Sequence, residues 1–424
     1  MATTKFWTTF GAVPSALFAV LLCQSIVEAQ APNRADLLEA EREVKRDEVK
    51  PPQRTTVERG MQLLEKALTR FENIKGSDPG LHYTSGHLPA GSGFGFGLGY
   101  TYRPTTKGGY SEPGRPNAID FEVGAAYSTR DYYETNAVVQ WRNIGASIVN
   151  AAWRAKYHED PEEDFFGLGP QSERGDRTNY LYREFEGTTD LWLSPAKGVR
   201  VGGSASYLTP SVGSGRDPRF ASLEEVFDPF TIAGFQGGQR NFLRVDAFLD
   251  YDRRDNSSYP RAGSFVGMKI SDYSDRDLDR FNFRRLELNA EQYVPFDNRY
   301  KVLALGANVV LTDADANNSV PFYFMPDLGG PQRLRGFREH RFRDNNSIVA
   351  TAEYRWEAWW ALDVAVFGDA GKVVARRSDI NLKNLEGTYG IGFRLHSKKA
   401  FAFRLDVAHS REGFIPIFTA KHVF

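Results

Sequence analysis

The feature that most constrains the fold is a period of two in side-chain polarity, which begins near residue 92 and continues to the C-terminus. Residues 243–252, LRVDAFLDYD, show it clearly. Side chains of a β-strand alternate between two faces, so the segment predicts a strand with one apolar and one mostly charged side. The apolar face carries Leu243, Val245, Ala247, Leu249 and Tyr251, and the other carries Arg244, Asp246, Phe248, Asp250 and Asp252.

Alternation is also found in soluble β-sandwiches, so strand length and charge must distinguish a sandwich from a membrane barrel. The alternating segments are about ten residues long, carry charge on one face and often end in Trp or Tyr, which is typical of tilted membrane-crossing strands with an aromatic girdle. Lipid cannot satisfy the open edge of a sheet, so such a sheet must close on itself. The predicted fold class is therefore all-β, a closed transmembrane antiparallel β-barrel.

The number of strands follows from counting alternating windows. Fifteen are present, whereas a single-chain bacterial barrel has an even number. Taking residues 295–299 as a periplasmic turn requires one further strand in the weakly patterned region around 80–90, so we predict sixteen. The connections after Thr209 and Thr312 are the longest and are candidate functional loops. The windows are 92–103, 118–129, 131–142, 148–157, 178–193, 198–209, 241–252, 262–272, 279–294, 300–312, 347–358, 361–373, 385–396, 400–410 and 415–424.

The N-terminal segment has a different pattern. Residues 10–23 are apolar but too short for a transmembrane helix, and small residues follow, so residues 1–29 predict a signal peptide. Cys23 could instead carry a lipid, although the preceding Leu22 is large for that processing. Residues 30–77 have helical spacing and many charges, which predicts a short helical periplasmic extension or plug. Residues 78–424 form the predicted outer-membrane barrel.

Charge and reactive residues argue against several function classes. The formal net charge is -1, which argues against nucleic-acid binding. The single cysteine lies in the predicted signal peptide, so we expect no disulfide, thiol catalysis or cysteine-bound metal in the mature chain. The seven histidines show no HExxH spacing. An esterase or lipase would need a Ser-His pair, but His409 and Ser410 are strand neighbours that point to opposite faces and could not readily share a proton. We therefore expect no cofactor, no metal and no enzymatic activity.

Four short motifs resemble the BamA/TamA superfamily of outer-membrane proteins, also called bacterial surface antigens. They are LRGF at 334–337, AEYRW around Glu353, VFGDAGKV around Asp369, and DRRD at 252–255 with PRAG at 260–263. The resemblance spans most of the predicted barrel. It implies a sixteen-stranded barrel whose long sixth extracellular loop folds back into the lumen.

The residues of these motifs agree with that arrangement. Alternation places Glu353 and Asp369 on the inward faces of neighbouring strands, where the planar head group of Arg335 could bridge them. Gly336 would permit a sharp reversal where a side chain would crowd the wall, and Phe337 could pack against Phe367 or other lumen aromatics. We predict these six residues as a loop latch. The other arginines of the loop, Arg333, Arg338, Arg341 and Arg343, are expected to be ordinary solvated residues.

Two functions follow from the resemblance. The first is insertion or translocation of polypeptides at the outer membrane of a Gram-negative bacterium, with client polypeptides and lipids as partners. The second is a passive or lipid-related channel in which the loop acts as a plug. Family members that handle proteins usually carry POTRA domains, and the short region before the barrel resembles members that lack them, which puts assembly activity in doubt.

Overall fold

The computed structural model describes residues 38–39, 41–42, 44, 63, 66, 79–84, 88–89, 91–106, 109–110, 117–236, 238–297, 300–396 and 401–419. The predicted signal peptide and most of the predicted helical extension lie outside these residues, as do the last five residues of the chain. Among the described residues, no helix has both the length and the apolar character needed to cross a bilayer. Residues 64–424 form one compact unit, which contains the sheet.

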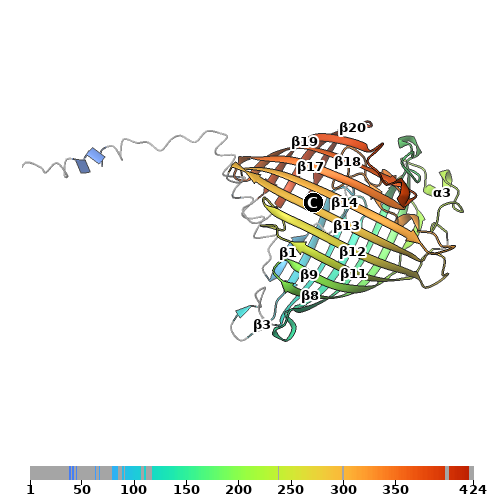
Figure 1. The fold of residues 1–424 in the computed structure, drawn as a ribbon, viewed down its shortest axis with the longest axis horizontal. Coiled ribbons are helices and arrows are strands. Elements are labelled where there is room, and N and C mark those ends of the chain that lie inside the picture. Colours follow the sequence, from blue (N-terminus) through green and yellow to red (C-terminus); the bar gives the residue numbers. More distant parts are fainter. Residues whose placement is uncertain are drawn as a thin grey trace, which may run out of the picture. The chain divides into compact units, whose positions relative to one another are not determined.

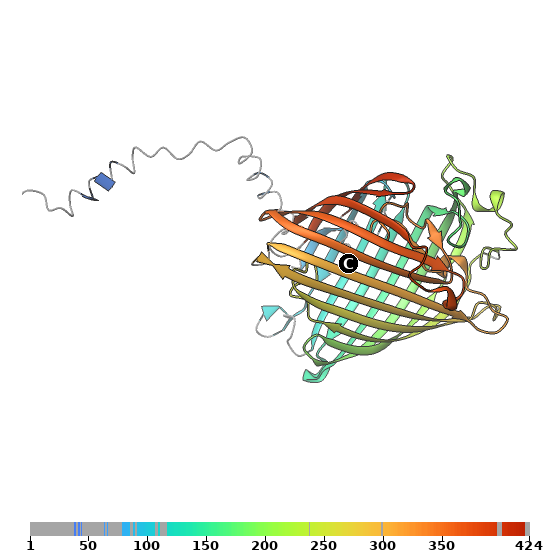
Figure 2. The same ribbon diagram turned by 45° about the horizontal axis from the view of Figure 1, so that its top comes forward.

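The unit is built from one large antiparallel sheet that curls around an interior (Figures 1 and 2). The sheet has 17 strands, one of which, β10, continues the edge of β8 that β9 begins. The strands are β1 (Gly80–Thr84), β2 (Gly95–Tyr102), β5 (Ala118–Ser128), β6 (Tyr133–Arg142), β7 (Val149–Phe165), β8 (Thr178–Ala196), β9 (Val199–Leu208), β10 (Ser211–Ser214), β11 (Phe242–Asp252), β12 (Gly263–Asp275), β13 (Phe283–Phe296), β14 (Lys301–Ala314), β17 (Asn346–Trp359), β18 (Leu362–Val374), β19 (Glu386–His396), β20 (Phe401–Ser410) and β21 (Gly413–Thr419).

Apart from β10, the strands of this sheet form a wall in which each strand pairs with the next one along the chain. All fifteen predicted windows contain a strand, and β1 supplies the further strand expected around residues 80–90. The strands β7 and β8 continue past their predicted ends. Because no pairing joins β21 to β1 within the described ranges, closure of the wall and its count of sixteen stay predictions.

The polarity of the wall is reversed relative to a soluble protein. On β11, Val245 and Leu249 are 51% and 45% exposed on the outer face, whereas Asp246 on the inner face is 5% exposed. The inner face of β20 likewise buries Arg404 and Asp406 completely, while Leu405 between them is exposed outside. This confirms the predicted assignment of faces and is what a strand between lipid and a polar lumen requires.

Connections at one end of the sheet form an aromatic cap. Phe165 and Tyr180 at the ends of β7 and β8 pack with Leu223 of helix α3 (Leu223–Val226) and with Phe322 of the 3-10 helix η4 (Phe322–Phe324). The ring centroids of Phe165 and Tyr180 lie 5.4 and 5.0 Å from that of Phe322. The cap therefore joins the two long connections predicted after Thr209 and Thr312 (Figure 1).

Candidate functional site: a loop held on the inner wall

The loop of residues 315–345 between β14 and β17, called loop 6 below, turns back onto the inner face of the sheet. The short strands β15 (Asp327–Leu328) and β16 (Phe342–Arg343) pair and bring its two arms together. The tip between them rests on one apolar cluster that includes wall residues of β17 and β18. The members of this cluster are Leu328, Leu334, Phe337, Phe342, Val349 and Val373.

Arg335 lies at the tip of loop 6 and is completely buried. Its Nε and Nη2 donate to the two carboxylate oxygens of Asp369 at 2.9 and 2.8 Å, and its Nη1 donates to Glu353 Oε2 at 2.6 Å. The Arg335 backbone N–H also donates to Asp369, at 2.8 Å. The guanidinium carbon lies 3.5 Å from the centre of the Phe367 ring, close enough for a cation–π contact. Only the planar fork of arginine offers this many directed donors.

The backbone conformation at the tip explains why a glycine, Gly336, follows Arg335. Gly336 has φ of +139°, and a Cβ placed there would lie 3.1 Å from both the His409 carbonyl oxygen and Thr388. The Gly336 carbonyl accepts a hydrogen bond from Ser410 Oγ of 2.6 Å. A side chain at this position would therefore push the tip away from the wall.

The structure brings the six predicted residues together. Of the two partners expected for Phe337, Phe367 or another aromatic residue, it shows the second: the Phe337 ring lies 5.0 Å from that of Phe342, within the apolar cluster of the tip. Phe367 lies beneath Arg335 and packs with Ala408 and Ile417 instead. Phe337 therefore fixes the tip, and Phe367 supports the guanidinium.

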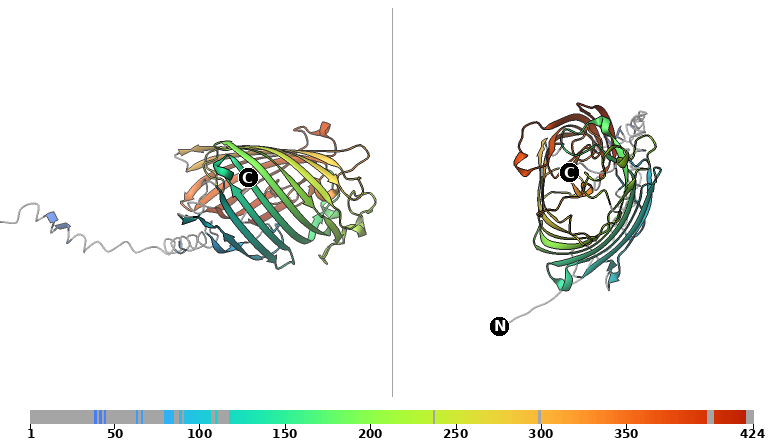
Figure 3. Two further views of the ribbon diagram at one scale, coloured as in Figure 1. Left: turned by 90° about the horizontal axis from the view of Figure 1, so that it is seen from below. Right: turned by 90° about the vertical axis from the view of Figure 1, so that its right-hand side faces the viewer.

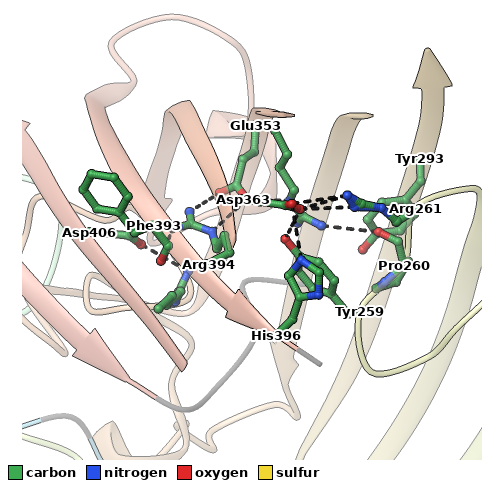
Figure 4. A network of polar contacts seen from close by, with 12 residues as sticks. Tyr259, Pro260, Arg261, Tyr293, Glu353, Asp363, Phe393, Arg394, His396 and Asp406 are labelled. Carbon is green, nitrogen blue, oxygen red and sulfur yellow. Dashed lines mark hydrogen bonds and ion pairs between the residues drawn. The ribbon is translucent and has the colours of Figure 1, made fainter. Parts of the chain in front are cut away.

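Glu353 forms ion pairs with two further arginines besides Arg335. Arg355 Nε and Arg394 Nη2 each donate to it at 2.7 Å, and Arg394 also pairs with Asp406 (Figure 4). Each of these residues is at most 1% exposed. Breaking a buried charge network by removing one member costs several kcal/mol because the partners stay buried and unpaired. Arg394 and Asp406 are not among the predicted site residues, because nothing in the residues alone shows that they reach Glu353.

The network continues to the turn between β11 and β12, which contains the DRRD and PRAG motifs. Tyr259 donates a 2.6 Å hydrogen bond to Asp363, and its ring stacks on His396 at 4.7 Å. Arg261 pairs with Asp363 at 3.2 Å (Figure 4) and with Glu357 at 2.8 Å. This turn therefore folds inward, as loop 6 does from the other end.

Arg355 connects the two parts. Its Nη1 donates to the Pro260 carbonyl at 3.3 Å while its Nε holds Glu353. A chain of contacts consequently runs from Arg335 through Glu353 and Arg355 to the turn at Pro260.

The expectation that the remaining loop 6 arginines are solvated is wrong for two of them. Arg341 is 1% exposed; its Nε donates to Glu412 at 2.6 Å, and its Nη1 and Nη2 donate to the hydroxyl and carbonyl oxygens of Ser172 at 2.8 Å. Arg343 is 4% exposed and donates to the Tyr180 hydroxyl at 3.1 Å. These partners lie on other loops and strand ends, where no periodicity signals a contact. Arg338 is exposed and Arg333 half-buried.

His340 stands between two carboxylates at the outer end of loop 6. Its Nε2 lies 2.5 Å from Glu163 Oε2, and its Nδ1 contacts Asp327. Burial alone would lower the pKa of His340, but the charges of Glu163 and Asp327 outweigh it and raise that pKa well above its usual value. The two carboxylates therefore favour the protonated form of His340. No group of three or more His, Cys, Asp or Glu side chains suited to a metal occurs in the part of the chain that the structure describes.

The comparisons with known proteins concern the family and the fold. A family model described as the Omp85 superfamily domain matches residues 114–412. A search of curated proteins found no match.

Among solved structures, the fold is similar to BamA from Haemophilus ducreyi lacking POTRA domains 1–3, with a TM-score of 0.57 and 13% identity over 84% of this chain and 78% of that one. CdiB from Escherichia coli gives a TM-score of 0.50 and 11% identity over 85% of this chain and 69% of that one. CdiB from Acinetobacter baumannii gives 0.44 and 10% over 78% of this chain and 57% of that one.

Proposed function

Because this chain belongs to the Omp85 superfamily, we propose that it is an outer-membrane β-barrel of a Gram-negative bacterium that inserts or translocates polypeptides. Loop 6, latched to the inner wall by Arg335, would hold the barrel in the working state. Its partners would be outer-membrane lipids and client polypeptides.

The observation that carries the proposal is the buried contact of Arg335 with Asp369 and Glu353. A loop that only blocked a pore would need bulk, whereas this tip is bound to three strands of the wall, β17, β18 and β20, through charges and the Ser410 hydrogen bond. Of these strands, β20 pairs with β21 (Gly413–Thr419), the last strand described. Loop 6 is thus positioned to control how firmly the wall is held beside its terminal strand.

The test is client folding in liposomes that contain the purified protein. We expect a urea-unfolded small β-barrel client to fold faster than in empty liposomes, and Arg335→Ala to remove most of that acceleration. Arg338→Ala, which changes an exposed arginine of the same loop, should leave it intact. Steady ion flux without any acceleration of client folding would instead support a passive channel plugged by loop 6.

A further inference from the structure

We propose that a hollow in the inner wall binds the cationic side chains of an extended polypeptide; this names the substrate class for the function proposed above and rests on it. The hollow has a volume of about 470 Å³ and is lined by residues of β6 to β9 and β11 to β13. These strands form the part of the wall drawn from teal to yellow in Figure 3. Loop 6 is anchored on β17, β18 and β20 instead, so its latch does not occupy the hollow.

Strand register arranges the hollow in rows. Ser204 on β9 pairs with Asp190 on β8 and with Asp246 on β11, so the two carboxylates stand at one height. In the next row, Gly202 pairs with Trp192 and Phe248 in the same way. A Cβ at Gly202 would lie only 2.6 Å from that of Trp192, so glycine keeps the floor open between two aromatic side chains.

Asp190 has unused capacity to bind a ligand. It is 8% exposed and lines the hollow, yet its Oδ2 accepts no hydrogen bond. Its Oδ1 accepts from Arg154 Nη2 at 2.7 Å, but the Arg154 side chain is 54% exposed, so solvent weakens this pair. Asp246 also has one oxygen without a donor, Oδ1, but its Oδ2 is bonded to Ser204 at 2.8 Å and to Arg244 at 3.0 Å, and the Arg244 side chain is only 17% exposed. A buried carboxylate oxygen without a donor favours a ligand that supplies one.

A guanidinium or ammonium group supplies the hydrogen-bond donor that Asp190 Oδ2 lacks. It offers N–H donors and positive charge to Asp190, and the faces of Trp192 and Phe248 can receive the same cation. The hollow's own cations would repel it little, because they are paired: Arg200 lies 2.7 Å from Asp250, and Lys269 lies 3.3 Å from Glu287. An extended chain presents a side chain to one face every second residue, so arginine or lysine at such spacing would follow the wall.

The test is binding of a fluorescent hexa-arginine peptide to the full chain in detergent micelles, measured by anisotropy. We expect saturable binding that Asp190→Asn weakens about tenfold, the loss of one charge-assisted hydrogen bond. Arg154→Gln should strengthen binding because it frees the carboxylate. Asp272→Asn, which removes a half-exposed carboxylate on the outer face of β12, should change nothing.

Equal affinity of the wild type and a folded Asp190→Asn variant would overturn the proposal, as would an equal loss in Asp272→Asn. Spermine binding more tightly than the peptide would overturn the assignment to a polypeptide. Folding of each variant is checked by the mobility of unheated protein on gels, and the opposite sign expected for Arg154→Gln keeps the test decisive if Asp190→Asn does not fold. If the protein binds the peptide through Asp190 but does not accelerate client folding, the proposed function is wrong and the binding site still stands.

Discussion

Arg335 shows how much a single side chain can organise once water is excluded from around it. Its guanidinium makes three hydrogen bonds to two carboxylates on neighbouring strands and rests on the ring of Phe367. The charges compensate one another only while all members are present, since each is buried. We therefore expect Arg335 to control whether loop 6 lies on the wall.

Removing Arg335 should destabilise the barrel strongly. We expect Arg335→Ala and Asp369→Ala each to lower the free energy of unfolding by about 3–5 kcal/mol, because each leaves a buried charge without its partner. The double variant should cost clearly less than the sum, since both changes remove one contact. Urea unfolding in micelles measures all three, with Arg338→Ala as the unaffected control. Full additivity would show that the two side chains do not interact.

The protonation of His340 predicts a pH dependence. Because its pKa is raised in the folded chain, its contribution to stability is complete below the unfolded value of about 6.5 and is lost as pH rises through the folded value. The difference in unfolding free energy between wild type and His340→Gln should therefore shrink as pH is raised above about 6.5. A difference that grows with pH would contradict the ion pairs with Glu163 and Asp327.

At the scale of elements, loop 6 holds more than its own strands. Arg341 joins it to Ser172 in the loop between β7 and β8 and to Glu412 in the turn between β20 and β21. Arg174 donates a further 2.8 Å hydrogen bond to the carbonyl of Glu412. The last hairpin is thus fastened at its turn by two other loops.

Losing Arg341 should loosen that hairpin in particular. We expect Arg341→Gln to raise amide hydrogen exchange in β20 and β21, with little change in β11 and β12, because only the former lie beside its contact. Arg338→Ala is again the matched control. Uniform exchange throughout the sheet would mean that Arg341 supports the barrel as a whole rather than the hairpin.

The elements also show what the sequence could reveal. Alternation predicted the inward faces of Glu353 and Asp369 because a strand has a fixed period, and Gly336 was recognisable from its place beside Arg335. Burial of Arg341 and Arg343 could not be predicted, since Ser172 and Tyr180 are more than 160 residues away in the chain. Loop residues have no period, so contacts of this kind depend on how the sheet curls.

At the scale of the whole molecule, polar contacts connect its two ends. Loop 6 enters from one end through Arg335, the turn at Pro260 enters from the other, and Glu353 and Arg355 lie between them. Both inward folds therefore depend on the same pair of charges on β17. A substitution that breaks the contacts at either end should therefore alter the stability of the contacts at the other.

A double-mutant cycle tests this connection. Arg261→Ala and Arg335→Ala, made singly and together, should show an interaction of about 0.5–3 kcal/mol in the free energy of unfolding, as found for residues in one network. Arg284→Ala, which removes a largely exposed pair with Asp272, should show none with Arg335→Ala. Zero coupling for Arg261 as well would mean that the two inward folds form independently.

The neighbour-to-neighbour pairing of the wall has a kinetic consequence. Arg335 is separated from Glu353 and Asp369 by only 18 and 34 residues, so its contacts need no strand before β17. Arg341 and Ser172 are 169 residues apart and can meet only after the sheet has curled. Since nearby contacts form at lower entropic cost, the tip of loop 6 should be in place on the nascent C-terminal strands early, and the Arg341 contact should be among the last steps of assembly.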